Sequence, residues 1–300
     1  MVVVSLFGGL GNQLFQYAAG RAVAIRRDTQ LRLDVTAFEV YQLRRYGLSH
    51  FNIHEEFAYT GPLARFFGHA RNPQVRRLRR HLPYFWFRSV KEEQPYLFDH
   101  GIFEAGRNVL LYGFWQNLRY FKGIAELLRR EFTVRTPPDA ENLFIADTIR
   151  SVDAVSVHVR RADYVTDADT LKVHGVCSAD YYHAAAREVA ASVRDPHFFV
   201  FCDDPVWAQA NLAFGHPTTF VTHNRADRNY EDLRLITLCK HHIIANSTFS
   251  WWGAWLGSNP QRIVIAPARW VNDDSIDTSG LFPEGWRRVQ DAGSPGSSQG

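Results

Sequence analysis

The sequence predicts an α/β protein with two doubly wound, parallel-sheet domains. Short apolar runs typical of buried strands alternate with segments of helical spacing. After residue 150, five such strands alternate with helical segments, a pattern that implies a parallel sheet. At 300 residues the chain is long for one core. We therefore expect an N-terminal domain over residues 1–150, a C-terminal domain over 151–290, and a disordered Gly/Ser-rich tail over 291–300.

Composition excludes several classes of protein. The net charge is only +3, so no nucleic-acid partner is required by charge. The three cysteines are odd in number and far apart, which argues against a disulfide framework and favours a reducing compartment. No apolar stretch reaches the roughly 18 residues of a membrane span, and the N-terminal apolar run lacks the features of a signal peptide. We expect a cytoplasmic protein.

A glycine-rich turn follows the first predicted strand, Val2–Phe7. It reads Gly8-Gly9-Leu10-Gly11-Asn12, and a helix with Asn12 as a plausible N-cap follows. Gly9, Gly11 and Asn12 are candidate contacts to an anion at this helix start. Asp34 lies where a dinucleotide fold keeps its ribose-binding acid, but the third glycine of that fingerprint is replaced by Leu14. The alternative interpretation is a tight turn that needs glycine only for its backbone conformation.

Residues 57–90 carry seven arginines and no acidic residue. The stretch from Arg71 to Arg80 is rich in arginine and is followed by aromatic residues. Basic and aromatic residues together can indicate peripheral contact with a membrane surface, or with nucleic acid, but a solvated helix face is the simpler interpretation.

An aromatic and amide cluster follows the predicted strand Val109–Tyr112. Trp115 and Gln116 stand in it, and such side chains can stack on a sugar and hydrogen-bond its hydroxyls. These two residues are therefore candidate acceptor contacts, with core packing as the alternative.

Two adjacent arginines end the predicted strand Ala154–Val159. Because side chains alternate along a strand, His158 and Arg160 share one face. Ligands of open α/β sheets lie beyond the carboxyl ends of the strands, where the guanidinium groups of Arg160 and Arg161 suit phosphate or carboxylate. A surface pair, or an ion pair with Asp163, is the alternative.

A second candidate lies at the helix start after the predicted strand His242–Ala245. Hydroxyl and backbone N–H groups of Ser247, Thr248 and Ser250 suit a diphosphate, and Phe249 stands among them. With the arginine pair, this segment could hold a diphosphate without a metal. Asp167-Ala168-Asp169 resembles a metal-binding D-x-D motif but does not follow a strand, so no metal site is expected.

At these motifs the sequence resembles the bacterial-type α-1,2-fucosyltransferases. Gly8 to Tyr17 is similar to their N-terminal signature, and His158 to Val165 to their basic motif, with Ala162 where glycine is usual. The resemblance runs from about residue 5 to residue 289. Its other blocks are Phe199–Asp204, Tyr230–Leu233, Asn246–Leu256, Gly113–Gln116 and Gly175–Ser178.

The resemblance implies a GT-B-like architecture, with two Rossmann-like domains facing each other across a cleft. It implies transfer of L-fucose from GDP-fucose to a galactoside 2-hydroxyl with inversion, and no metal or other cofactor. It also implies that Arg160 holds the donor phosphates and that His158 and Asp232 recognise the nucleotide. Ser247, Thr248, Phe249 and Ser250 are implied to line the donor pocket.

The general base is not singled out by the sequence. Asp163 is the acid nearest to Arg160, and it either removes the acceptor proton or only orients an arginine. Asp34, Asp167 and Asp169 are alternatives, as is proton transfer to the departing diphosphate. Two other functions stay open: a dinucleotide-dependent oxidoreductase, and a non-enzymatic protein that binds membranes or nucleic acid.

Overall fold

The computed structural model describes residues 1–39, 44–58, 88–161 and 168–291. The chain forms two compact units. The first comprises Met1–Arg135 with Asp277–Leu281, and the second Thr136–Ile276 with Phe282–Gly300. The division falls before helix α5 (Ala140–Ser151), not near residue 150 as expected, because α5 packs against α10 (Asn229–Leu238) of the second unit.

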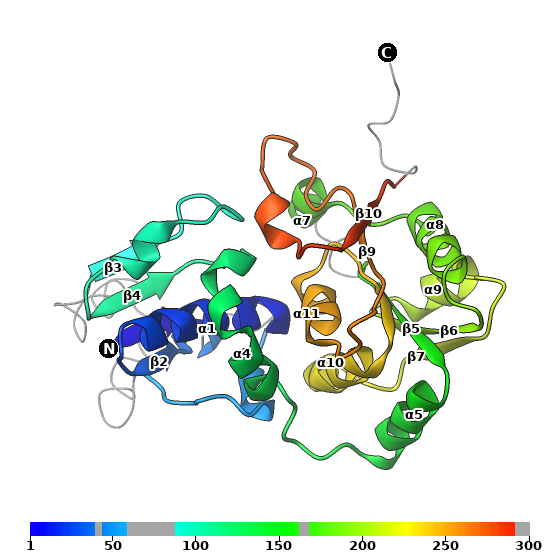
Figure 1. Cartoon of the computed structure of the whole chain (residues 1–300), viewed down its shortest axis with the longest axis horizontal. Helices are drawn as coiled ribbons and strands as arrows, with labels where there is room; N and C mark the ends of the chain where they lie inside the picture. The colour runs from blue at the N-terminus through cyan, green and yellow to red at the C-terminus, as the bar shows by residue number, and fades with distance from the viewer. Residues whose placement is uncertain (40–43, 59–87, 162–167, 292–300) are drawn as a thin grey trace. The chain divides into compact units, whose positions relative to one another are not determined.

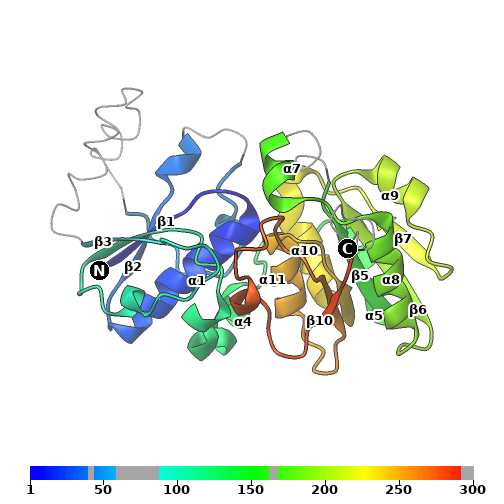
Figure 2. The same ribbon diagram turned by 90° about the horizontal axis from the view of Figure 1, so that it is seen from above.

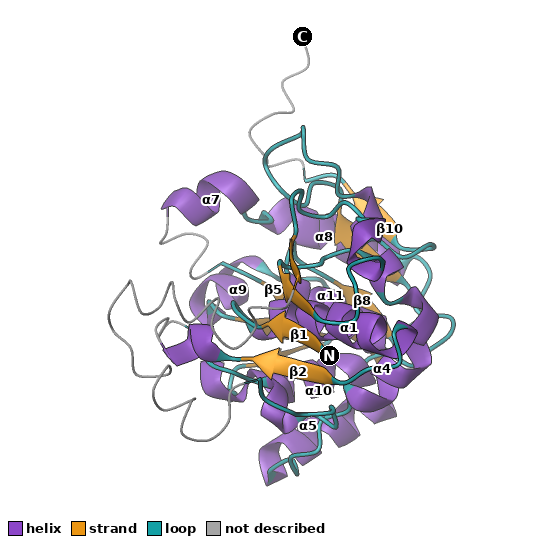
Figure 3. Ribbon diagram, turned by 90° about the vertical axis from the view of Figure 1, so that its left-hand side faces the viewer, coloured by secondary structure: helices purple, strands orange, loops and turns teal. Residues whose placement is uncertain are grey.

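The first unit is built on a four-stranded parallel sheet with strand order β2-β1-β4-β3. Figure 3 shows β1 and β2 side by side. Helix α1 (Leu10–Arg26) packs closely on this sheet, because a Cβ at Gly20 would lie only 3.0 Å from side-chain atoms of Val4 and Leu31. The strands are β1 (Val2–Ser5), β2 (Leu31–Asp34), β3 (Arg88–Lys91) and β4 (Val109–Tyr112), and a second helix is α4 (Ala125–Glu131).

The second unit is built on a six-stranded parallel sheet with strand order β10-β9-β8-β5-β6-β7. The strands are β5 (Asp153–Val159), β6 (Pro196–Cys202), β7 (Thr218–Val221), β8 (His241–Ile243), β9 (Val264–Pro267) and β10 (Arg287–Val289). The helices, labelled in Figure 1, are α5, α7 (Ala168–His174), α8 (Ala179–Ala190), α9 (Pro205–Asn211), α10 and α11 (Thr248–Leu256).

Alternate residues of β5 and β6 face two separate cores. Val155 and Val200 pack in a core that includes residues of α8 and α9. Ala154 and Phe199 pack in a second core that includes residues of α5 and α10. Helices therefore cover both faces of the sheet (Figure 2), which explains why these strands are continuous apolar runs in the sequence.

The predicted α/β class is confirmed, since each of the two units is a parallel sheet with helices packed on it. All five strands expected in the second half exist, whereas β3 and β10 were missed. No helix in the described part of the chain is long and apolar enough to cross a membrane. Of the expected disordered tail the structure describes only Asp291, whose carboxylate accepts a hydrogen bond from Ser178 N at 2.8 Å.

Candidate functional site

The strand order of the second unit reverses between β5 and β8. The chain passes from β5 to β6 and β7 on one side, then returns to β8 on the other side of β5. In open α/β sheets the ligand lies beyond the carboxyl ends of the strands at such a reversal. His158, Arg160 and Arg161 stand at the end of β5, and β8 leads into the start of α11. The two predicted donor motifs therefore flank one topological switch point.

The arginine pair is held by two acidic residues that follow β6. Arg160 Nη1 lies 2.9 Å from Asp203 Oδ2, and the backbone N–H of Arg161 donates to Asp203 Oδ1 at 2.8 Å. The Arg161 guanidinium lies 3.8 Å from Asp204 and 3.9 Å above the ring of Trp207. Both arginine side chains keep about a fifth of their surface exposed, 22% and 18%. They are thus oriented by the protein and still open to an anion.

His158 is buried beside the arginines and is uncharged. Its ring centroid lies 5.2 Å from that of Phe249 at the start of α11. Burial, followed by the nearby charge of Arg160, lowers the pKa of the His158 imidazole to about 3. A neutral imidazole can both donate and accept a hydrogen bond, so His158 suits recognition of a polar ligand group better than charge neutralisation.

The start of α11 is shaped by its own serines. Ser247 is the N-cap, and its hydroxyl accepts from Phe249 N at 3.3 Å. Thr248 and Phe249 are partly exposed. Ser250 is fully buried, and its hydroxyl donates to the carbonyls of Ser247 and Ala245. The expectation that Ser250 lines a ligand pocket is therefore not supported, because its hydroxyl is buried and hydrogen-bonded to backbone carbonyls at the helix start.

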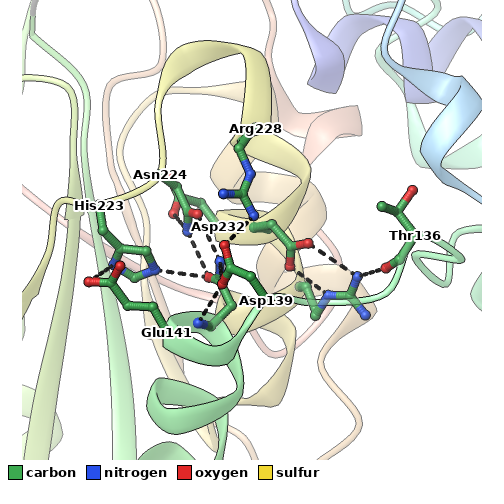
Figure 4. Close-up of polar contacts among 10 residues, drawn as sticks. Thr136, Asp139, Glu141, His223, Asn224, Arg228 and Asp232 are labelled. Atoms are coloured by element: carbon green, nitrogen blue, oxygen red, sulfur yellow. Dashed lines mark hydrogen bonds and ion pairs between the residues drawn. The ribbon is translucent and has the colours of Figure 1, made fainter.

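Asp232 lies in the first turn of α10, near the end of β6. Burial raises the pKa of its carboxyl to about 7, the Glu231 charge adds to the rise, and a hydrogen bond from Asn224 opposes it. The pKa of the Cys202 thiol is raised to about 12, first by burial and then by Asp203, Asp232 and Asp204, so these acids surround one strand end. Figure 4 shows Asp232 beside Asn224. A carboxyl with so raised a pKa at a strand end is typical of a binding site.

The glycine turn of the first unit is braced internally. Gly8 has a φ of +78°, and a Cβ there would lie 2.8 Å from the Asn12 side chain, so glycine is required. The N-cap of α1 is Gly9, not Asn12 as predicted, and Gly11 lies within the helix. The side chain of Asn12 instead accepts a hydrogen bond from Gln116 Nε2 at 3.0 Å.

The structure places the predicted acceptor residues Trp115 and Gln116 inside the first unit. Trp115 is fully buried and Gln116 is 7% exposed. The Trp115 ring is part of the core and cannot stack on a sugar in this conformation. The exposed aromatic side chains nearby are Tyr112 and Phe114, which pack around Phe7 with ring centroids 5.1 Å and 4.9 Å from it.

Several predicted residues lie outside the described part of the chain. These are Asp163, the alternative base Asp167, and the basic stretch 71–80. The side chain of Asp169 is likewise not described. Among the residues that the structure describes, no group of three or more His, Cys, Asp or Glu side chains could hold a metal ion.

Asn224 and Asn142 are site neighbours that the sequence did not reveal. They belong to segments 82 residues apart, and no sequence motif at either residue predicts a contact between them. Asp203 did carry a signal, because it follows a buried strand directly.

Comparison with known proteins agrees with the motifs. Residues 88–290 match glycosyl transferase family 11. The alpha-1,2-colitosyltransferase of Escherichia coli is 36% identical over 97% of this chain and 99% of its own length. The chain belongs to glycosyl transferase family 11. This places the switch point of the second unit in a glycosyltransferase, and the resemblance to α-1,2-fucosyltransferases is confirmed at the level of the family.

Two further relatives share parts of the same similarity. The O-antigen biosynthesis glycosyltransferase WbnK of Escherichia coli is 31% identical over 88% of this chain and 93% of the relative. Galactoside alpha-(1,2)-fucosyltransferase 1 of Rattus norvegicus is 30% identical over 49% of this chain and 41% of the relative.

Proposed function

We propose that this family 11 glycosyltransferase moves L-fucose from GDP-β-L-fucose to the 2-hydroxyl of a galactoside, with inversion to an α-1,2 linkage. Two relatives carry an α-1,2 activity in their names, and one of them is a galactoside fucosyltransferase. The choice of GDP as the nucleotide and of fucose as the sugar comes from the resemblance of the motifs to those of α-1,2-fucosyltransferases.

One observation carries the proposal. Arg160, oriented by Asp203, directly follows β5, and the start of α11 follows the neighbouring strand β8 at the switch point. A guanidinium and the N–H groups of a helix start are both anion ligands. Their placement on adjacent strands suits the diphosphate of a nucleotide sugar. His158 and Asp232 at the same edge supply polar groups for the rest of the nucleotide.

The proposed reaction is a displacement at the fucose anomeric carbon. The acceptor oxygen forms a bond to C1 while the bond from C1 to the diphosphate oxygen breaks, so GDP leaves with the bonding electron pair. The acceptor proton passes to a protein base, for which Asp163 is the candidate, or to the departing diphosphate. Arg160 and the α11 N–H groups stabilise the negative charge that develops on GDP, usually the largest catalytic contribution.

We further propose that these cationic and N–H groups make a metal ion unnecessary. The expected result is undiminished transfer in excess EDTA. Activity that disappears on chelation and returns with manganese or magnesium would contradict this part of the proposal.

A second donor deserves a direct test because the colitosyltransferase relative aligns over nearly the whole chain. Colitose is L-fucose without its 3-hydroxyl. A pocket that hydrogen-bonds this hydroxyl rejects the deoxy sugar by about 10⁴-fold or more, whereas an apolar pocket rejects the extra hydroxyl by only about 10²-fold. The size and direction of the preference therefore report the chemistry of the pocket.

The decisive experiment compares GDP-fucose and GDP-colitose as donors with a panel of galactosides. The expected result is a higher kcat/KM with GDP-fucose and an α-1,2 linkage in the product by NMR. A preference for GDP-colitose would assign the second donor, and transfer from neither would overturn the proposal.

A further inference from the structure

Asp232 has an unusual set of neighbours for a carboxylate with so little exposure to water. Among the described residues, Asn224 Nδ2 donates a hydrogen bond to Asp232 Oδ1 at 2.8 Å (Figure 4). The arginines on either side in sequence pair elsewhere, Arg228 with Asp139 at 2.7 Å and Arg234 with Glu231 at 2.8 Å. No Lys, Arg or His among the described residues forms an ion pair with Asp232. The network therefore engages one carboxylate oxygen.

The direction of the Asn224 amide is set by Asp139. Hydrogen bonds from Asn142 N and from Arg228 hold the pKa of Asp139 at about 2, so this carboxylate only accepts. Asn142 Nδ2 must therefore face it, and does so at 2.9 Å. The Asn142 carbonyl oxygen then points to Asn224, whose Nδ2 donates to it at 2.9 Å. The same Nδ2 group reaches Asp232, so Asn224 presents N–H, not oxygen, to the acid.

The network is built into the fold. Asp139 is the N-cap of α5, and Asn142 is fully buried in the first turn of that helix. The Asn142 oxygen also lies 3.0 Å from His223 Nε2, and its Nδ2 donates to Asn224 Oδ1 at 3.0 Å. Reversing either amide would bring oxygen against oxygen in a buried place, which is costly. The orientations of the Asn142 and Asn224 amides between Asp139 and Asp232 are therefore fixed.

We propose that Asn224 is a positioning residue for base recognition. It holds one oxygen of Asp232, in an orientation imposed by Asp139 and Asn142, so that the carboxylate faces the adjacent ring N–H and amino group of a guanine. The inference rests on the proposed function, since it concerns how a GDP-sugar donor is selected.

Recognition of two N–H donors requires an ionised carboxylate. The pKa of Asp232 is about 7. A protonated acid loses acceptor capacity, so the affinity for guanine should weaken as the pH falls through about 7. It should reach its full value above that pH, where the carboxyl is ionised. Without the Asn224 donor the charged form loses support and the pKa rises further. Other titratable or charged groups around this pair are Glu231 on α10, Cys202 after β6, His223, and the Asp139–Arg228 pair.

The test is GDP binding by calorimetry between about pH 5.5 and about pH 8.5. Asn224→Ala should move the midpoint of the pH dependence up by about one unit, the effect of one hydrogen bond to a charged group. Affinity should then fall about fivefold at pH 7 and come within about twofold of wild type at pH 8.5. Asn142→Ala should move the midpoint in the same direction but less.

Two controls make the readout specific. Asp232→Asn removes the titrating group, so the pH dependence left in it belongs to the diphosphate of GDP and to the other titrating groups of the protein, and it is the baseline for the Asn224 variant. Asn211→Ala removes an exposed amide elsewhere in the second unit, bonded to Trp207 O, and should behave like wild type.

Either of two results would overturn the inference. One is an unchanged affinity and midpoint in Asn224→Ala. The other is a uniform loss that does not recover at high pH, which would indicate general damage to the site. Failure of the proposed function looks different, because the wild-type chain itself would then not bind GDP at any pH.

Discussion

Arg160 is the residue at which a single substitution should affect turnover most directly. Its guanidinium is oriented by Asp203 and remains partly exposed at the switch point. We expect Arg160→Ala to lower kcat by about 10²- to 10³-fold, the usual cost of one donor to developing charge. Arg160→Lys should recover little, because an ammonium lacks the planar fork of a guanidinium.

Steady-state kinetics at saturating acceptor checks this prediction. Arg119→Ala is a suitable control, since Arg119 belongs to the first unit and lies over the ring of Phe98. Wild-type turnover in either Arg160 variant would remove this residue from the catalytic machinery.

Asp163 follows the arginine pair, and its role stays a prediction from sequence. Asp163→Asn keeps the shape of the side chain and removes its charge. If Asp163 is the base, turnover should fall by about 10²-fold or more while GDP affinity is unchanged. If it only orients an arginine, GDP binding should weaken as well. Parallel measurements of kcat and the Kd for GDP separate the two, and a variant normal in both respects would exclude both roles.

At the scale of elements, the contact between α10 and α11 holds two site segments in place. Asp232 stands on α10 and Phe249 on α11. Gly253 lies where the helices meet, and a Cβ there would overlap Cγ2 of Ile236. We expect Gly253→Ala to destabilise the second unit by about 1–3 kcal/mol, as overpacking does in well-packed cores.

Gly123→Ala is the matched control, because a Cβ at Gly123 would meet nothing within 4 Å. Differential scanning calorimetry should show a lower Tm for Gly253→Ala only. Equal Tm values for the two variants would contradict the prediction. They would mean that α10 and α11 can move apart enough to fit the methyl group without loss of stability.

The missed elements are those that the hydrophobic pattern does not mark. β3 and β10 are edge strands of four and three residues, and most of their side chains are exposed. α5 buries only Asn142, Ala146 and Ile149. Such segments become strand or helix through their partners, and a single sequence shows no partner.

At the scale of the whole molecule, the open prediction concerns membranes. Residues 71–80 lie outside the described part of the chain, and their arginine-rich composition suits peripheral binding to an anionic surface as well as a solvated helix face. Each basic residue near such a surface contributes about 1 kcal/mol, and salt screens it. We expect the protein to co-sediment with phosphatidylserine-containing vesicles at low salt and to be released at high salt. No binding at low salt would exclude the membrane role and leave a solvated surface.

The sequence alone determined the α/β class, the family and the strand ends that carry the donor motifs. Apolar runs such as β5 and β6 are buried on both faces wherever they lie in the sheet, so local composition is enough to identify them. His158, Arg160 and Ser247 follow, because a residue at the end of a parallel strand, or at the helix start after it, necessarily reaches the same edge.

Only the tertiary structure decided which polar and aromatic side chains remain available. Trp115 and Ser250 are as suitable as their neighbours by residue type, but packing buries both, while Tyr112 and Phe114 stay exposed. The Asn142–Asn224 contact joins segments 82 residues apart. Burial and amide orientation depend on what packs against a side chain from distant parts of the chain, and that information is absent from any local pattern.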